Sequence, residues 1–166
     1  ERLVGSEMCI RDRALRFRDY KTQEWMSISW NQFKTNIERE AKSLYKAGLD
    51  VEDKVAIFSQ NCPEILTTHF AAYYNRGVAV PIYATSSKNE AAYIINDAQT
   101  LVLFVGDQQQ YDIAMEIVDE CPSLKYVVTY NPLVEKRADD KISMTWEEFL
   151  DWGEDADVEL LNKRKE

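Results

Sequence analysis

Glycine is scarce in this sequence, and its scarcity excludes the common phosphate-binding loops. The five glycines lie far apart: Gly5, Gly48, Gly77, Gly106 and Gly153. A loop that wraps a phosphate needs several glycines close together, so that its amide groups can approach the oxygens. Neither GxGxxG nor the Walker pattern occurs, and Gly48 and Gly77 are interpreted as helix stops.

Histidine and cysteine are also rare, which leaves little material for a metal centre or a nucleophile. His69 is the single histidine, and Cys9, Cys62 and Cys121 are scattered without ligand spacing, which indicates reduced thiols. His69 is interpreted as a helix-surface or partly buried side chain rather than a catalytic base. Cys62 precedes Pro63 at a predicted helix start, where amide dipoles would lower its thiol pKa. Because no base is evident nearby, packing is favoured over a reactive thiol.

The sequence lacks both an excess of positive charge and a long apolar run. Its net charge of -9 repels phosphate backbones and argues against a nucleic-acid partner. The longest apolar stretch, near residues 78–84, is much shorter than a membrane span. The first residues do not have the apolar stretch of a signal peptide. We therefore expect a cytoplasmic protein, with peripheral membrane contact left open.

Short apolar runs alternate with helical segments through the middle of the chain. The runs, each predicted to be a strand buried on both faces, are 55–58, 78–82, 101–105 and 126–129. The intervening segments open with capping signals, which are Asn61 with Glu64, Ser87 with Glu90, and Asp107 with Gln110. This alternation predicts the α/β class, a parallel β-sheet with helices on both faces. In the helix predicted after Asn61, Leu66, Phe70 and Tyr73 are expected on the apolar face. Pro81 suits an edge or the last bonded position of its strand.

A β-hairpin is expected before this sheet, and a short helix after it. Residues 14–18 and 25–28 each alternate apolar with polar side chains and should pair. Ser29 with Gln32 is a capping box for a helix that ends near Gly48. Thr145 with Glu148 is another, for a helix that stops near Gly153.

The length of 166 residues and the 45% apolar content fit one domain, which we place at residues 14–153. Residues 1–13 are aperiodic, and 4–13 resemble translated sequencing-adaptor DNA. They are expected to be a non-native or disordered tail, in which Cys9 has no role. Residues 154–166 are highly charged and have little to bury, so we expect a loose tail.

Few residues are candidates for binding a ligand. Thr85 and Ser86 follow a predicted strand end, where parallel sheets commonly bind ligands, although most such loops are simple turns. The acidic residues between 147 and 155 lack the periodicity of a calcium loop and are interpreted as a solvated face. No catalytic, cofactor-binding or metal-binding residue is predicted.

Several blocks of the sequence resemble the opening part of adenylate-forming enzymes. They are residues 27–30, 47–49, 53–57, 59–64, 76–87, 93–98 and 103–106. Each block is weak alone, but their order and spacing are specific, and the resemblance as a whole covers about residues 14 to 152. Within the superfamily, residues 83–87 and 104–112 are most similar to bacterial long-chain fatty-acid CoA ligases.

The resemblance implies a two-step reaction. A fatty acid and ATP with magnesium would give an acyl-adenylate, and CoA would then displace AMP. The family's phosphate loop, Tyr-x-x-Thr-Glu segment, ribose-binding aspartate, hinge and C-terminal lysine do not occur here, so no catalytic residue is carried over. We expect the N-terminal part of such an enzyme, truncated before these motifs, without a cofactor of its own, inactive alone, and covered by the remainder of the synthetase chain.

Other interpretations stay open. A stand-alone, non-enzymatic α/β binding module would be monodisperse and would melt cooperatively. A fragment would instead leave an apolar sheet edge or helix face uncovered. Within the superfamily, a luciferase-like ligase or a peptide-synthetase domain is the alternative.

Overall fold

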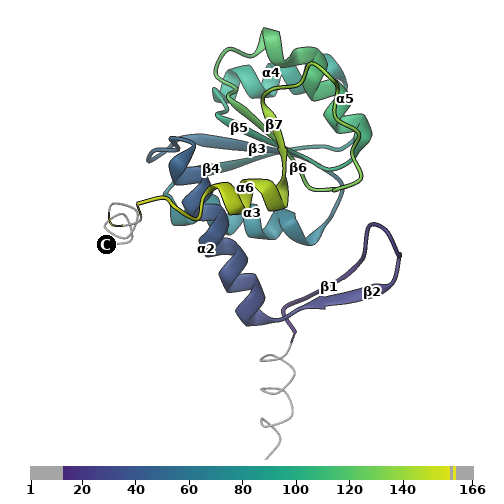
Figure 1. Ribbon diagram of the computed structural model, residues 1–166. Coiled ribbons are helices and arrows are strands. Elements are labelled where there is room, and N and C mark those ends of the chain that lie inside the picture. Colours follow the sequence, from purple (N-terminus) through teal and green to yellow (C-terminus); the bar gives the residue numbers. More distant parts are fainter. Residues whose placement is uncertain (1–12, 158, 160–166) are drawn as a thin grey trace, which may run out of the picture.

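A five-stranded parallel sheet lies at the centre of the computed structural model, which describes residues 13–157 and 159 (Figure 1). The strands are β3 (Lys54–Phe58), β4 (Val78–Ile82), β5 (Val102–Val105), β6 (Tyr126–Thr129) and β7 (Ser143–Thr145). Their order across the sheet is β4-β3-β5-β6-β7, and every neighbouring pair is parallel. The predicted apolar runs therefore all form strands of one sheet.

Helices cover both faces of this sheet, as Figure 1 shows. On one face lie α2 (Trp30–Lys46), α3 (Pro63–Tyr74) and α6 (Trp146–Trp152). On the other lie α4 (Lys88–Ala98) and α5 (Gln108–Ile117), the latter followed by a 3-10 turn at Val118–Glu120. The predicted α/β class is confirmed.

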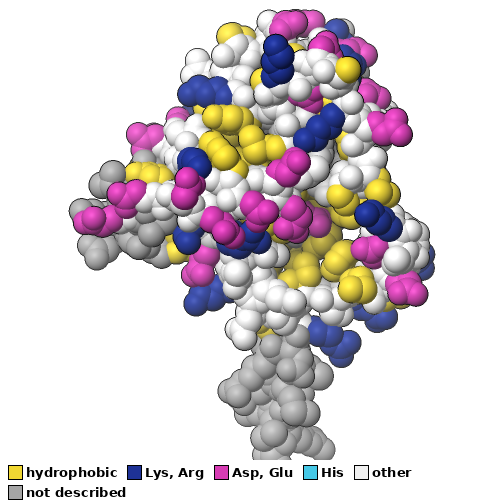
Figure 2. Space-filling model, in the orientation of Figure 1, with side chains coloured by type: hydrophobic (Ala, Val, Ile, Leu, Met, Phe, Trp, Pro, Cys, Tyr) yellow, Lys and Arg dark blue, Asp and Glu magenta, His cyan; other side chains and the backbone are white. Residues whose placement is uncertain are grey.

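The predicted hairpin is also confirmed. Strand β1 (Leu15–Arg18) pairs with β2 (Trp25–Ile28) in antiparallel register. Phe17 of β1, together with Pro63 and Leu66 of α3, lines a cavity of about 370 Å³ between the hairpin and that helix. Figure 2 shows hydrophobic side chains gathered in this region. The hairpin is thus attached to the domain beside α3.

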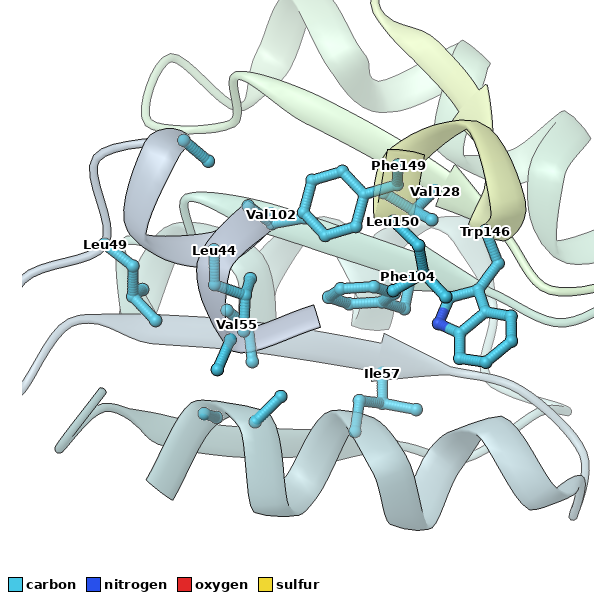
Figure 3. Packing of buried hydrophobic residues seen from close by; sticks show 14 of the residues in the cluster. Leu44, Leu49, Val55, Ile57, Val102, Phe104, Val128, Trp146, Phe149 and Leu150 are labelled. Carbon is cyan, nitrogen blue, oxygen red and sulfur yellow. The ribbon is translucent and has the colours of Figure 1, made fainter. Parts of the chain in front are cut away.

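The period-2 alternation of the central strands divides the core into two clusters. In β3, Val55 and Ile57 face helices α2, α3 and α6, whereas Ala56 and Phe58 face α4 and α5. Phe104 of β5 joins the first cluster. Its ring stacks on Tyr130 with centroids 5.6 Å apart, and it meets the edge of Phe149 at 5.8 Å. Figure 3 shows Phe149, Leu150 and Trp146 of α6 beside Phe104, which explains how so short a helix is held.

Most of the predicted caps are present. Complete capping boxes occur in three helices: Ser29 with Gln32, Ser87 with Glu90, and Thr145 with Glu148. At α5, the Asp107 amide donates to Gln110 Oε1 at 3.1 Å. The prediction for α3 is wrong, because its N-cap is Cys62 rather than Asn61 and no side chain caps it. Pro63 at the first helical position removes one of the amide donors that would need a partner.

The edges of the sheet differ from the sequence-based expectation. Strand β4 was expected to be buried on both faces, but it is an edge strand and Val78 is 44% exposed. Pro81 lies on this edge, as expected. Strand β7 was not predicted, because Ser143–Thr145 is too short to show a pattern.

Two helix ends use different residues to reverse the chain. Gly48, after α2, has a φ of +94° and is a left-handed stop, as predicted. After α3, however, Arg76 takes the left-handed conformation with a φ of 59°. Gly77 is instead needed for close packing, since a Cβ there would lie 3.0 Å from the Asp53 carbonyl oxygen. Its interpretation as a helix stop is wrong.

The face that α3 buries was predicted wrongly. Leu66, Phe70 and Tyr73 are 43%, 49% and 56% exposed. The buried positions are Pro63 at the start of the helix and then Thr67, Thr68, Ala71 and Ala72. Small side chains allow the helix axis to approach the sheet closely, so the bulky ones are turned outward.

Candidate functional site

A cavity of about 670 Å³ lies at the carboxyl ends of β3 and β4. Its walls are the segment after β3, one side of α3 and the segment after β4. Polar atoms are contributed by Ser59, Gln60, Asn61, His69 and Thr85. Ligands of parallel α/β sheets bind at this edge, which makes the cavity the candidate functional site.

Of the two predicted ligand-side residues, the structure places one in the lining. Thr85 lines the cavity and is exposed. Ser86 is not among the lining residues, and its amide donates to the Tyr83 carbonyl at 2.9 Å within a turn. Binding of a ligand by either hydroxyl stays a prediction.

Gln110 positions the segment after β4, a role that sequence reasoning did not identify. Its side chain is fully buried and comes from the first turn of α5. Its Nε2 donates to the Ala84 carbonyl at 2.8 Å, while its Oε1 accepts from the Asp107 amide. The sequence predicts the capping bond, in which Gln110 Oε1 is the acceptor. It does not predict the bond that Gln110 Nε2 donates to Ala84.

His69 points toward the cavity from α3 and is partly buried. Burial lowers the pKa of its imidazole, which favours the neutral ring. Nδ1 lies 3.5 Å from the Tyr73 hydroxyl, one helical turn away. Among the residues that the structure describes, no carboxylate forms a hydrogen bond with this ring. His69 therefore lacks the orienting partner of a catalytic base here.

Cys62 behaves opposite to the expectation of a lowered pKa. Burial, with a further contribution from the charge of Glu64, raises the pKa of its thiol to about 12. Its Sγ lies 3.8 Å from Ser59 Oγ. Desolvation of a thiolate costs more than the amide dipoles of the helix start recover, so the thiol stays protonated.

Gly106 fixes the approach of two strand ends next to the site. A Cβ at this position would lie 2.4 Å from Ser59 Oγ and 3.0 Å from Gln60 Oε1. A larger residue here would require the Ser59 and Gln60 side chains to move, so Gly106 favours close packing of the segment after β5 against the segment after β3. Sequence reasoning gave this residue no role, because the contact is made across the sheet.

The acidic cluster near the C-terminus forms ion pairs on the surface. Arg39 Nη2 lies 2.5 Å from Asp151 Oδ1 and 3.1 Å from Glu154 Oε1, and Lys46 Nζ lies 2.5 Å from Asp155 Oδ1. Figure 2 shows acidic side chains gathered on the surface near α6. Within the described part of the chain, no group of three or more histidine, cysteine, aspartate or glutamate side chains could hold a metal ion.

The tails expected at both ends are only partly covered by the structure. Residues 1–12, including Cys9, and residues 158 and 160–166 lie outside the described residues. The ion pairs of Glu154 and Asp155 attach the start of the C-terminal segment to α2. Over the residues described, no helix has both the length and the apolar character required to cross a membrane.

Solved structures with the same fold include two ligases. Coronafacic acid ligase from Pectobacterium brasiliense superposes with a TM-score of 0.70 at 18% identity, over 89% of this chain and 28% of that one. The anthranilate CoA ligase AuaEII, solved with anthranoyl-AMP, gives a TM-score of 0.67 at 19% identity, over 76% and 23% respectively. At such low identity the likeness establishes the fold.

Sequence comparisons establish the family. Long-chain-fatty-acid–CoA ligase ACSBG1 of Homo sapiens is 33% identical over 145 residues, which are 86% of this chain and 20% of that protein. ACSBG2 of Xenopus laevis is 29% identical over 141 residues, which are 84% of this chain and 19% of that protein. The chain thus spans about a fifth of the length of these relatives. The family model described as AMP-binding enzyme matches residues 7–160, and the chain therefore belongs to this family.

Proposed function

We propose that this chain is the N-terminal part of a long-chain fatty-acid CoA ligase. The whole enzyme would convert a fatty acid, ATP and CoA into acyl-CoA, AMP and diphosphate, with magnesium, in the cytoplasm. The observation that carries the proposal is the match of most of this chain to about a fifth of ligases that bear this name. The motif blocks at residues 59–64 and 76–87, which border the cavity, support it.

The chain itself supplies scaffold rather than reaction chemistry. Adenylate formation builds negative charge on phosphate oxygens, which must be stabilised by cations or by several amide donors. The described lining of the cavity contains neither lysine nor arginine. Gly106, the glycine next to the cavity, has the Ser59 side chain packed against it, so no space for a phosphate is left at that glycine. We therefore expect the 166-residue chain to be inactive alone.

The outer face of α3 supports a larger parent protein. Leu66, Phe70 and Tyr73 face outward, while Ala71 and Ala72 on the other side are fully buried. A helix that is apolar on both sides is typical of one that is covered on both sides. We propose that the remainder of the ligase packs against Leu66, Phe70 and Tyr73, named here the outer aromatic face.

Two experiments test this proposal. Sequencing of the genomic DNA on either side should reveal a glycine-rich phosphate-loop motif in frame after residue 166. A stop codon there would overturn the proposal and favour the stand-alone module. Purified 166-residue chain should give no fatty-acid-dependent diphosphate release, whereas the longer reading frame should. Activity of the short chain would contradict the assignment of chemistry to the remainder.

A further inference from the structure

A fully buried carboxyl group, Glu40, joins helices that are distant in the sequence. Thr68 Oγ1, on α3, donates to Glu40 Oε1 at 2.5 Å. Trp146 Nε1, at the start of α6, donates to Glu40 Oε2 at 3.0 Å. Thr68 Oγ1 also lies 2.7 Å from the hydroxyl of Tyr130, which follows β6. All members of this network, named here the Glu40 clasp, are buried.

In the part of the chain that the structure describes, no cation neutralises this carboxyl group. Among the described residues no lysine, arginine or histidine forms an ion pair with Glu40, and its neighbour Arg39 is turned toward Asp151 and Glu154. The titratable groups that face Glu40 are Glu64 and Tyr130, whereas α6 contributes only the neutral indole. An isolated buried carboxylate is costly, so the neutral acid is strongly favoured.

We propose that Glu40 is protonated in the native domain at neutral pH, and that this neutral carboxyl clasps α6 to α2 and α3 as a pH-sensitive device. The hydrogen-bond pattern accommodates the added proton. In the protonated state the Thr68–Glu40 bond reverses: Glu40 Oε1–H donates to Thr68 Oγ1, Thr68 donates to the Tyr130 oxygen, and Oε2 still accepts from Trp146. When the proton leaves, Tyr130 must donate to Thr68 and Thr68 to Glu40, which leaves a buried charge with two donors.

The consequence of deprotonation falls on α6. This helix has only seven residues, and its docking depends on Phe149 and Leu150, which are fully buried, and on Trp146. A charge beside the Trp146 indole favours entry of water between α6 and α2. Raising the pH should therefore loosen α6, and with it β7, which directly precedes α6.

The direction in which stability changes with pH follows from the raised pKa of Glu40. Burial, the largest effect, and the charge of Glu64 raise the pKa of Glu40 from 4.5 to about 8, against the opposing hydrogen bonds from Thr68 and Trp146. The native state then binds more protons than the unfolded state between these values. The contribution to stability is complete below pH 4.5, falls as the pH rises toward 8, and is lost above it.

Carboxyl ¹³C NMR of the full 166-residue chain, labelled at glutamate, tests the protonation directly. The resonance that disappears in Glu40→Gln should titrate with a midpoint near 8, well above the ordinary glutamate value of 4.5. Trp146→Phe keeps an aromatic ring but removes the donor to Oε2, so it should move the Glu40 midpoint higher still. A Glu40 midpoint near 4.5, or one unmoved by Trp146→Phe, would overturn the proposal.

Unfolding in urea at several pH values tests the clasp itself. Glu40→Gln should flatten the decline in stability between pH 4.5 and 8, whereas Glu38→Gln, the matched control, should preserve it. Glu64→Gln separates the effect of the neighbouring carboxyl group, whose pKa is also raised by burial. An undiminished decline in Glu40→Gln contradicts the proposal. If Glu40→Gln does not fold, the Glu40 midpoint is assigned as the wild-type glutamate resonance that shifts in Trp146→Phe.

Discussion

At the scale of single residues, burial has a larger effect on the pKa of the Cys62 thiol than the position of Cys62 at a helix start. A helix start is a favourable place for a cysteine thiolate, but Cys62 is partly buried, with Ser59 Oγ 3.8 Å from its Sγ. Glu40 shows the same effect on a carboxyl group. In both residues the cost of desolvating a charge exceeds what local dipoles and hydrogen bonds recover.

This balance makes the reactivity of Cys62 measurable. Because the pKa of its thiol is raised to about 12, the thiolate fraction at pH 8 should be at least ~100-fold below that of an ordinary cysteine. We expect iodoacetamide to modify Cys62 in the native chain at least ~100-fold more slowly than in the urea-unfolded chain. Peptide mass spectrometry measures both rates. Equal rates, or a native rate that levels off below pH 10, would contradict this expectation.

At the scale of elements, the three complete capping boxes should each contribute to stability. Replacement of the capping hydroxyl in Ser29→Ala, Ser87→Ala or Thr145→Ala should lower the unfolding free energy by about 1 kcal/mol, because the amide of the third helical residue loses its acceptor. Asn61→Ala is the matched control. It removes the side chain that sequence reasoning assigned as a cap but that the structure does not use, so it should change stability by less than about 0.5 kcal/mol. Equal losses in all variants, measured in urea, would refute the cap assignment.

The elements that sequence reasoning predicted correctly are those specified by neighbouring residues. The hairpin, the apolar strands and the boxes at Ser29, Ser87 and Thr145 depend on periods of two or on contacts three residues apart. The cap predicted at Asn61 is a local miss, but the two larger misses depend on partners remote in the chain. Strand β7 forms only because β6 is beside it, and the buried face of α3 is chosen by the space above the sheet.

The same limit applies to the candidate site. Strand ends at one edge were predictable, so Thr85 could be placed near a cavity. The sequence does not predict that His69 lines the cavity or that Gln110 holds the segment after β4, because both depend on how α3 and α5 pack. The Glu40 clasp was equally invisible, since its members are separated by up to 106 residues.

At the scale of the whole molecule, the outer aromatic face predicts how the isolated chain behaves. Trp30 lies next to it, since the rings of Trp30 and Phe70 each meet the ring of Phe33 edge to face. Trp30, Leu66, Phe70 and Tyr73 together form an exposed apolar surface larger than scattered single residues provide. Edge strand β4 also has unpaired backbone groups on one side. We expect the purified chain to self-associate as its concentration rises.

The double variant Leu66→Gln/Tyr73→Gln tests this expectation without disturbing the core. It retains Phe70, which packs against the buried ring of Phe33 with centroids 5.9 Å apart, so the unfolding free energy should be nearly unchanged. The average mass from light scattering should fall toward that of a monomer. Tyr93→Gln is the control: Tyr93 is 69% exposed on α4, across the sheet, and its loss should leave the association intact. A wild-type chain that is monomeric at every concentration would mean that the outer aromatic face tolerates water, and would remove the main structural support for a covering partner.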